Sequence, residues 1–288
     1  MNSIILYRNI FTTTGATVTA RDTTTGYNVS NVYDYKAYTS WRAQPASDHL
    51  IQWIEVALPE EEVDAAATGL PIDTAGGGDL LSAASGPGEY TPDTIGIFNH
   101  NLGSLGITVT LQRWNTFTSA WVDILDLTPT TDKTILRTFT TVNANKYRLY
   151  MVCPAAGINI RISQIYLGQR LEFPFRPEGP VVPISEAIEL KAETSKAGYI
   201  LGALVAHWPF TLSHLWKYLT RAWYRDYFLP FWDDHAKYLK PFFYAWDLDE
   251  RPDDVYFVSV DPGMVRREPL SILTYSDELQ LQMRSIGN

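Results

Sequence analysis

The residues that decide the fold are two stretches in the middle of the chain, Ile107-Thr-Val-Thr-Leu-Gln-Arg-Trp114 and Lys146-Tyr-Arg-Leu-Tyr-Met151. Apolar and polar side chains alternate in both, which is the pattern of a β-strand with one buried face. Similar short segments, separated by turn-forming residues, are found at 4–8, 17–20, 51–58, 94–98, 120–125, 134–140 and 160–167. Short strands at this spacing predict an antiparallel β-sandwich.

The composition is that of a globular protein large enough for two buried cores. The chain has 288 residues, of which 45% are hydrophobic and 19% are charged, and it carries nine tryptophans. Aromatic side chains at this density suit β-sheets and extensive interfaces. Cys153 is the only cysteine, which excludes an internal disulfide and a cysteine-based zinc site. We therefore expect assembly in a reducing cytosol.

Charge and hydropathy narrow the range of partners. The net charge is −9, which argues against nucleic acid. No stretch reaches the roughly 18 apolar residues that a membrane helix needs, and the first residues have neither a basic region nor a long apolar run. We therefore expect no membrane span and no signal peptide.

Residues 59–93 interrupt the alternating pattern. They are rich in Ala, Gly, Ser and Pro, contain eight acidic residues between Glu60 and Asp93, and include no Lys or Arg. No hydrophobic period is visible, which predicts an exposed loop inserted between two strands. A solvated spacer and an ordered arm that touches a neighbouring subunit are both compatible with this composition.

A proline-rich run, Leu171-Glu-Phe-Pro-Phe-Arg-Pro-Glu-Gly-Pro180, marks the boundary between two predicted domains, 1–170 and 171–288. Its prolines are incompatible with a helix or a central strand. In the second domain the spacing of Leu212, Leu215, Trp216, Leu219 and Trp223 predicts a helix over 212–229. Pro230 is expected to end or kink it. Strands are expected at 185–193, 199–206, 242–246, 254–260 and 278–284.

Four motifs in the first 170 residues carry a resemblance to a known fold. They are Asn31-Val-Tyr-Asp34 with Trp41, Gln52-Trp-Ile-Glu-Val-Ala-Leu58, Ile95-Gly-Ile-Phe-Asn-His-Asn-Leu102, and Tyr147-Arg-Leu-Tyr150 with Ile162-Ser-Gln-Ile-Tyr-Leu167. In this order they resemble the discoidin-like (coagulation factor 5/8 C-type) galactose-binding β-sandwich. The resemblance implies a jelly roll that presents loops for binding and supplies no catalytic apparatus.

The same resemblance suggests roles for individual residues. Trp41 and Trp53 are predicted core residues, with a sugar-stacking platform as the alternative. Asp34, Trp41 and His100 are the candidates for a ligand loop, although His100 also suits a purely structural turn. Asp22 and Asp34 are candidates for calcium only by analogy. A lone pair of aspartates predicts no metal, and no cofactor is expected.

The second domain resembles the ring-forming domain of long-tailed phage distal-tail and minor tail proteins. The resemblance rests on an aromatic segment followed by Pro241-Phe-Phe-Tyr-Ala-Trp-Asp247 and by a late strand from Leu279 to Gly287. It implies an α+β domain, a β-barrel or split sandwich with a packed helix, that joins a six-fold ring below the tail tube. An aromatic load this heavy on a small domain predicts a subunit interface. The candidate interface residues are Trp216, Trp223, Trp232 and Trp246.

Motifs of catalysis are missing from the sequence. It contains no Gly-x-Ser-x-Gly, P-loop, His-Glu-x-x-His or strand-linked GxGxxG. Asp233-Asp-His235 could form an acid/base cluster, but its place in a helical turn beside Lys237 predicts a solvated face instead. The sequence therefore predicts a non-enzymatic structural protein of a phage tail tip, assembled in the host cytoplasm beside tube, hub and fibre proteins. A lectin-like protein that binds surface glycan is the alternative, and a polymer-degrading hydrolase is a third hypothesis.

Overall fold

The computed structural model describes residues 2–43, 49–59, 91–178, 185–186, 189–194, 196–197, 199–207, 210–262, 264 and 275–286. The chain forms two compact units, Leu6–Arg170 and Met1–Ile5 with Leu171–Asn288. The sequence analysis placed the first five residues in the first domain. Instead, Ile4 and Ile5 of strand β1 (Ile4–Leu6) pair with Glu172 and Leu171 of β11 (Leu171–Glu172) in the second unit. The predicted acidic loop lies largely outside the described residues.

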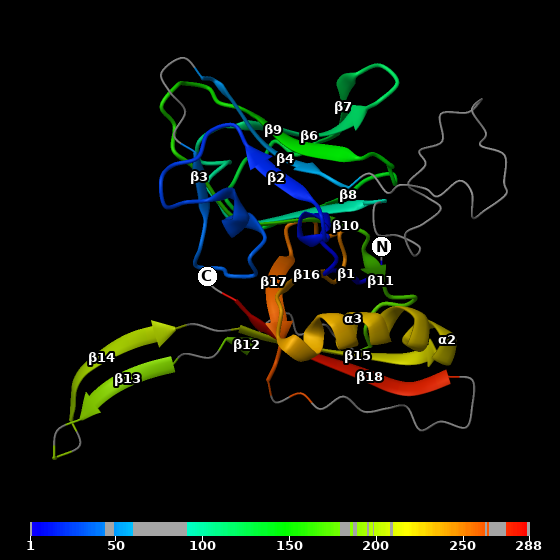
Figure 1. Ribbon diagram of the computed structural model, residues 1–288. Helices are drawn as coiled ribbons and strands as arrows, with labels where there is room; N and C mark the ends of the chain where they lie inside the picture. Colours follow the sequence, from blue (N-terminus) through cyan, green and yellow to red (C-terminus); the bar gives the residue numbers. More distant parts are fainter. Residues whose placement is uncertain are drawn as a thin grey trace. The chain divides into compact units, whose positions relative to one another are not determined.

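The first unit is an antiparallel sandwich of two sheets (Figure 1). The five-stranded sheet has the order β2 (Thr17–Ala20), β4 (Ile51–Ala57), β9 (Lys146–Val152), β6 (Thr108–Asn115), β7 (Ala120–Asp126). The four-stranded sheet has the order β3 (Trp41–Ala43), β10 (Ile160–Gly168), β5 (Thr94–His100), β8 (Ile135–Thr138). Two short helical turns, η1 (Ile10–Thr12) and η2 (Val29–Val32), accompany them. The predicted mainly β fold is confirmed.

One apolar core lies between the two sheets. Ile54 and Leu149 from the five-stranded sheet share it with Ile97 and Ile162 from the four-stranded sheet. Trp41 is fully buried in this core, as predicted. Burial of its large ring removes apolar surface from water, which is the main stabilising contribution to such a core.

The prediction that Trp53 is a core residue is wrong. Strand β4 buries every second residue, and the buried set is Gln52, Ile54 and Val56. Trp53 belongs to the opposite phase and is half-buried on the outer face of the sheet. Successive side chains of a strand point to opposite faces of the sheet, so the position of Trp53 in the strand decides its face, and its hydrophobicity does not.

The second unit contains a sheet of seven strands and a separate hairpin (Figure 1). The order in the sheet is β11, β1, β16 (Phe242–Ala245), β17 (Val255–Val260), β18 (Tyr275–Ser285), β15 (Phe210–Thr220), β12 (Ser185–Glu186). Strands β13 (Glu189–Thr194) and β14 (Ile200–His207) pair with one another as a two-stranded sheet. The short strand β11 lies at the edge of its sheet and ends two residues before Pro174, which has no backbone donor with which to continue a ladder.

The helix predicted over 212–229 is wrong for its first half, because residues 210–220 form strand β15. Leu212, His214 and Trp216 face the buried side by simple alternation. Tyr218 then adopts a positive φ of 63° and breaks the alternation, so that Leu219 is the next buried residue. The spacing of Leu212, Trp216 and Leu219 thereby imitates a helical period within a strand.

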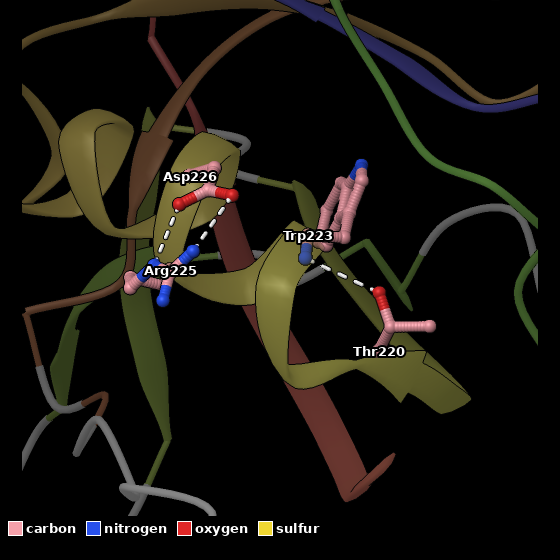
Figure 2. A network of polar contacts seen from close by, with 4 residues as sticks. All are labelled: Thr220, Trp223, Arg225 and Asp226. Carbon is pink, nitrogen blue, oxygen red and sulfur yellow. Dashed lines mark hydrogen bonds and ion pairs between the residues drawn. The ribbon is translucent and has the colours of Figure 1, made fainter. Parts of the chain in front are cut away.

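The helical segment starts at Arg221 and runs through α2 (Arg221–Trp223), the π-helical turn η4 (Tyr224–Phe228) and α3 (Leu229–Asp234). Thr220 caps it, since its Oγ1 accepts a hydrogen bond of 3.2 Å from the Trp223 N–H (Figure 2). Arg225 and Asp226 form an exposed ion pair on the next turn, with Nε 2.7 Å from Oδ1. Pro230 has no N–H for the i→i−4 ladder, and the π-helical turn lies just before it.

Candidate ligand-binding face

The residues predicted for a ligand loop are all engaged within the sandwich. The Asp34 carboxylate accepts hydrogen bonds from the Lys36 N–H, the Thr39 hydroxyl and the Gln164 amide, at 2.8–3.0 Å. The buried Trp41 indole donates to Thr23 Oγ1 at 3.2 Å. These hydrogen bonds stabilise the fold locally. The polar groups that form them are paired within the protein and do not make a binding site for a ligand.

His100 is 2% exposed and is held on both ring nitrogens. Its Nδ1 accepts from the Leu102 N–H at 3.3 Å, and its Nε2 donates to the Lys133 carbonyl at 2.8 Å. Burial lowers the pKa of His100, with the Lys133 carbonyl acting in the opposite direction. The imidazole is therefore a neutral structural link between strand β5 and the segment that precedes β8.

The tryptophans predicted at a subunit interface differ in burial. Trp216 is fully buried and stacks on Phe173, with ring centroids 4.1 Å apart and planes 12° from parallel. It is therefore a core residue of the second unit, which corrects the interface prediction for this position. Trp223, Trp232 and Trp246 are half-buried, and the Trp223 indole donates to the Glu172 carbonyl at 3.3 Å.

The Asp233-Asp-His235 motif does not form a solvated cluster. His235 is buried, and its Nε2 donates to the Pro241 carbonyl at 2.7 Å. Burial lowers the pKa of His235 to about 4, although the carbonyl partner opposes the shift. Asp233 is exposed and instead faces Lys237 at 3.4 Å. This arrangement has no aligned acid and base.

A different set of side chains gathers on the outer face of the five-stranded sheet. Residues paired directly in an antiparallel sheet project to the same face. The pairs Trp53–Tyr150, Glu55–Arg148, Gln112–Arg148, Gln112–Asp123 and Trp114–Trp121 therefore share one face. We call these residues the sheet-face cluster: Trp53, Glu55, Gln112, Trp114, Trp121, Asp123, Arg148 and Tyr150.

Arg148 is at the centre of the sheet-face cluster. Its guanidinium carbon lies 4.1 Å from the ring centroid of Trp121 and 4.8 Å from that of Tyr150. A cation over an aromatic face is attracted by the ring quadrupole. Burial lowers the pKa of Arg148, while Tyr150, Glu55 and Asp123 act in the opposite direction. Arginine remains charged in proteins, so the cluster holds a fixed cation against aromatic surface.

A hydrogen-bond chain across three strands orients this cation. Arg148 Nε donates to Gln112 Oε1 at 2.6 Å, and Gln112 Nε2 donates to Asp123 Oδ1 at 2.6 Å. The glutamine amide is thereby fixed at both ends. One face of the sheet then offers a directional donor, a carboxylate acceptor and several aromatic rings, including the edge-to-face pair Trp114–Trp121 with centroids 5.3 Å apart.

This combination suits a ligand with apolar C–H surface and hydroxyl groups. Aromatic rings bind apolar C–H faces, and charged side chains form strong, directional hydrogen bonds with hydroxyls. The sequence contained a signal for this face. Trp53, Trp114 and Tyr150 lie at the alternate strand positions that are otherwise polar. Side chains at these positions point away from the core, so large aromatic residues there are unusual. The hydrophobicity of Trp53 alone had predicted a core residue.

The described part of the chain holds no group of three or more His, Cys, Asp or Glu side chains arranged to bind a metal ion. Among the same residues, no helix has the length and apolar character required to span a membrane. The carboxylate of Asp22, considered for calcium, accepts from Gln52 Nε2 at 2.6 Å and lies 3.1 Å from His49 Nδ1.

Carbohydrate-binding modules are among the solved structures to which part of the chain is similar. No family model and no curated protein sequence matches the chain. Among solved structures, it is similar to chitosan-binding module 1 of a Paenibacillus sp. IK-5 chitosanase/glucanase, at 17% identity and a TM-score of 0.37 over 56% of this chain and 98% of that one. A pectin-binding carbohydrate-binding module gives 16% identity and a TM-score of 0.34 over 52% and 88% of the two chains.

A glycoside hydrolase also contains a similar region. The GH29 fucosidase E1_10125 of Ruminococcus gnavus gives 14% identity and a TM-score of 0.38, with 57% of this chain covering 27% of that one. At such TM-scores these matches do not define a ligand for this chain. The function proposed below rests on the sheet-face cluster.

Proposed function

We propose that this protein is a non-catalytic binding protein that recognises carbohydrate through the sheet-face cluster. The observation that carries the proposal is the chain Asp123–Gln112–Arg148, which lies between aromatic rings on the outer face of a sheet. A pyranose ring has C–H groups that can stack on indole and hydroxyls at its rim that need both donors and acceptors. The cluster supplies all three kinds of contact.

A purely structural role for the cluster is the competing explanation, because cross-strand cation–π pairs also stabilise sheets. Such a role would not need the half-buried Trp53, which makes no ring contact with Arg148. Binding specificity in pockets and on sheet faces commonly comes from a few polar groups fixed among aromatic ones.

The test is affinity electrophoresis of the full chain in gels that contain single polysaccharides, followed by titration calorimetry with the oligosaccharide of any polymer that retards it. Trp53→Ala is expected to weaken binding by on the order of tenfold. Tyr38→Ala is the matched control, because Tyr38 is an aromatic residue of the same unit that is 84% exposed outside the cluster. Retardation that is equal for wild type and Trp53→Ala would contradict the proposed site.

The tail-tip role is a second hypothesis that rests on the sequence resemblance. The half-buried rings of Trp223, Trp232 and Trp246 leave aromatic surface for subunit contacts, whereas Trp216 does not. A ring role and a glycan-binding role involve different units of the chain, so both could hold for one protein. Imaging of assembled particles tests the ring: the second unit should form a cyclic belt around the tail axis.

A further inference from the structure

The charges on the outer face of the five-stranded sheet decide which saccharides it can accept. Strand β4 contributes Glu55, strand β9 contributes Lys146 and Arg148, and strand β7 contributes Asp123 and Asp126. Strand β2 contributes only Thr17 and Thr19, and the outward residues of β6 are uncharged. Within the five strands three carboxylates therefore share the face with two cations, and the Arg148 guanidinium lies between Glu55 and Asp123. A further cation, Arg21, follows β2 and donates its backbone N–H to the Trp53 carbonyl at 3.1 Å.

We infer that the sheet-face cluster selects uncharged saccharides with vicinal hydroxyls and rejects uronic acid or sulfated ones. This inference rests on the proposed carbohydrate-binding function and specifies its ligand class. The guanidinium of Arg148 has its Nε bonded to Gln112 and its central carbon close to two aromatic rings, so its remaining N–H groups form a directional donor edge. Asp123 has one carboxylate oxygen bonded to Gln112 and presents an acceptor beside that edge.

A pair of neighbouring hydroxyls matches this donor and acceptor, because one hydroxyl can accept from the guanidinium while the other donates to the carboxylate. A ligand carboxylate or sulfate can only accept. It would pair with Arg148 but would meet Glu55 and Asp123, whose charges repel it, and it has no donor for the Asp123 oxygen that is not bonded to Gln112. Like-charge juxtaposition of this kind is a common source of selectivity against the wrong ligand.

The experiment compares matched neutral and charged polymers with the full chain. Affinity electrophoresis and calorimetry would use cellulose, mannan, galactan and methyl-esterified polygalacturonate as neutral probes, with polygalacturonate, alginate and heparin as anionic probes. We expect retardation by at least one neutral polymer, little dependence on NaCl concentration, and anionic polymers weaker by on the order of tenfold or more. Tighter binding of an anionic polymer would overturn the inference and leave the proposed function standing.

A charge variant provides a second measurement. Glu55→Gln removes one repelling carboxylate without altering the Asp123–Gln112–Arg148 chain, so it should raise the ratio of anionic-polymer affinity to neutral-polymer affinity severalfold. Asp226→Asn, at an exposed site in the second unit, is the matched control and should change neither. Equal affinities for Glu55→Gln and wild type on every anionic probe would contradict the selection mechanism. Failure of all probes to bind would instead reject the proposed function itself.

Discussion

The guanidinium carbon of Arg148 lies 4.1 Å from the ring centroid of Trp121, although the two residues come from strands β9 and β7, which are not neighbours in the sheet. Gln112 on the intervening strand β6 contacts the Arg148 side chain and, through Asp123, also strand β7. Three strands thus hold a single cation in one orientation. A group fixed in this way loses little rotamer entropy when a ligand binds, which favours affinity.

Arg148→Lys should weaken glycan binding and leave the stability of the fold nearly unchanged. Lysine keeps the positive charge but loses the Nε–H···Oε1 bond to Gln112 and the planar guanidinium group over the Trp121 ring. We expect glycan affinity to fall by about tenfold, with a change of no more than about 1 kcal/mol in the free energy of unfolding. Chemical denaturation and calorimetry measure the two quantities.

The matched control for that variant is Arg42→Lys. Arg42 lies on strand β3 of the other sheet, and its guanidinium carbon is 4.1 Å from the ring centroid of Tyr27. The same chemical change there should leave glycan affinity unaltered. A similar loss of affinity in both variants would mean that Arg148 acts through the fold of the sandwich and makes no contact with ligand.

Trp41→Ala should destabilise the sandwich strongly. Trp41 has no exposed surface, so truncation leaves a large cavity in the core and also removes the hydrogen bond of the indole to Thr23. Large-to-small changes of this kind cost about 3–5 kcal/mol. Tyr38→Ala, at an exposed position, should stay within about 0.5 kcal/mol of wild type. Denaturant unfolding checks both values, and a Trp41 variant as stable as the Tyr38 variant would show that the core assignment is wrong.

The second unit should lose stability in acid because of His214. The ring is buried against Trp216 and Tyr244, and burial lowers the pKa of His214 to about 4 from its usual 6.5. The unfolded chain therefore binds a proton at higher pH than the folded one does. The stability is fully present above about pH 6.5 and is lost as the pH falls toward 4, by up to about 1.4 kcal/mol per pH unit for one such group.

His214→Phe keeps an aromatic ring in this place and removes the titration. Thermal unfolding of wild type between pH 7 and pH 4.5 should show a steeper loss than the variant does. His235, whose pKa burial also lowers to about 4, keeps part of the acid sensitivity in both proteins. Identical pH profiles would show that His214 takes up no proton on unfolding in this range.

Local alternation in the sequence located the strands of the sandwich other than β3, because each of them has one face against the core. The three residues of β3 are too few to show a period. Local alternation could not place Ile4 and Ile5, since a short apolar run does not reveal which sheet it joins. It also failed at β15, where the positive φ of Tyr218 shifts the buried phase and imitates a helix. These features depend on tertiary pairing and on one backbone angle.

The sheet-face cluster was missed for a related reason. Trp53, Gln112, Trp121 and Arg148 come together only when the register between β4, β9, β6 and β7 is known. Register is a non-local property that short sequence patterns do not specify. Asp34 and His100 were predicted as ligand residues from the resemblance to a known fold. In the structure both form hydrogen bonds with other residues of the sandwich.

The most direct test of carbohydrate recognition by the sheet-face cluster is an NMR titration that follows the tryptophan indole N–H signals, assigned with single Trp→Phe variants. The account predicts that the signals of Trp53, Trp114 and Trp121 shift together and saturate with one Kd as oligosaccharide is added. The buried Trp41 and Trp216 are internal controls and should not shift. Saturable binding that leaves the signals of Trp53, Trp114 and Trp121 unmoved would contradict the account.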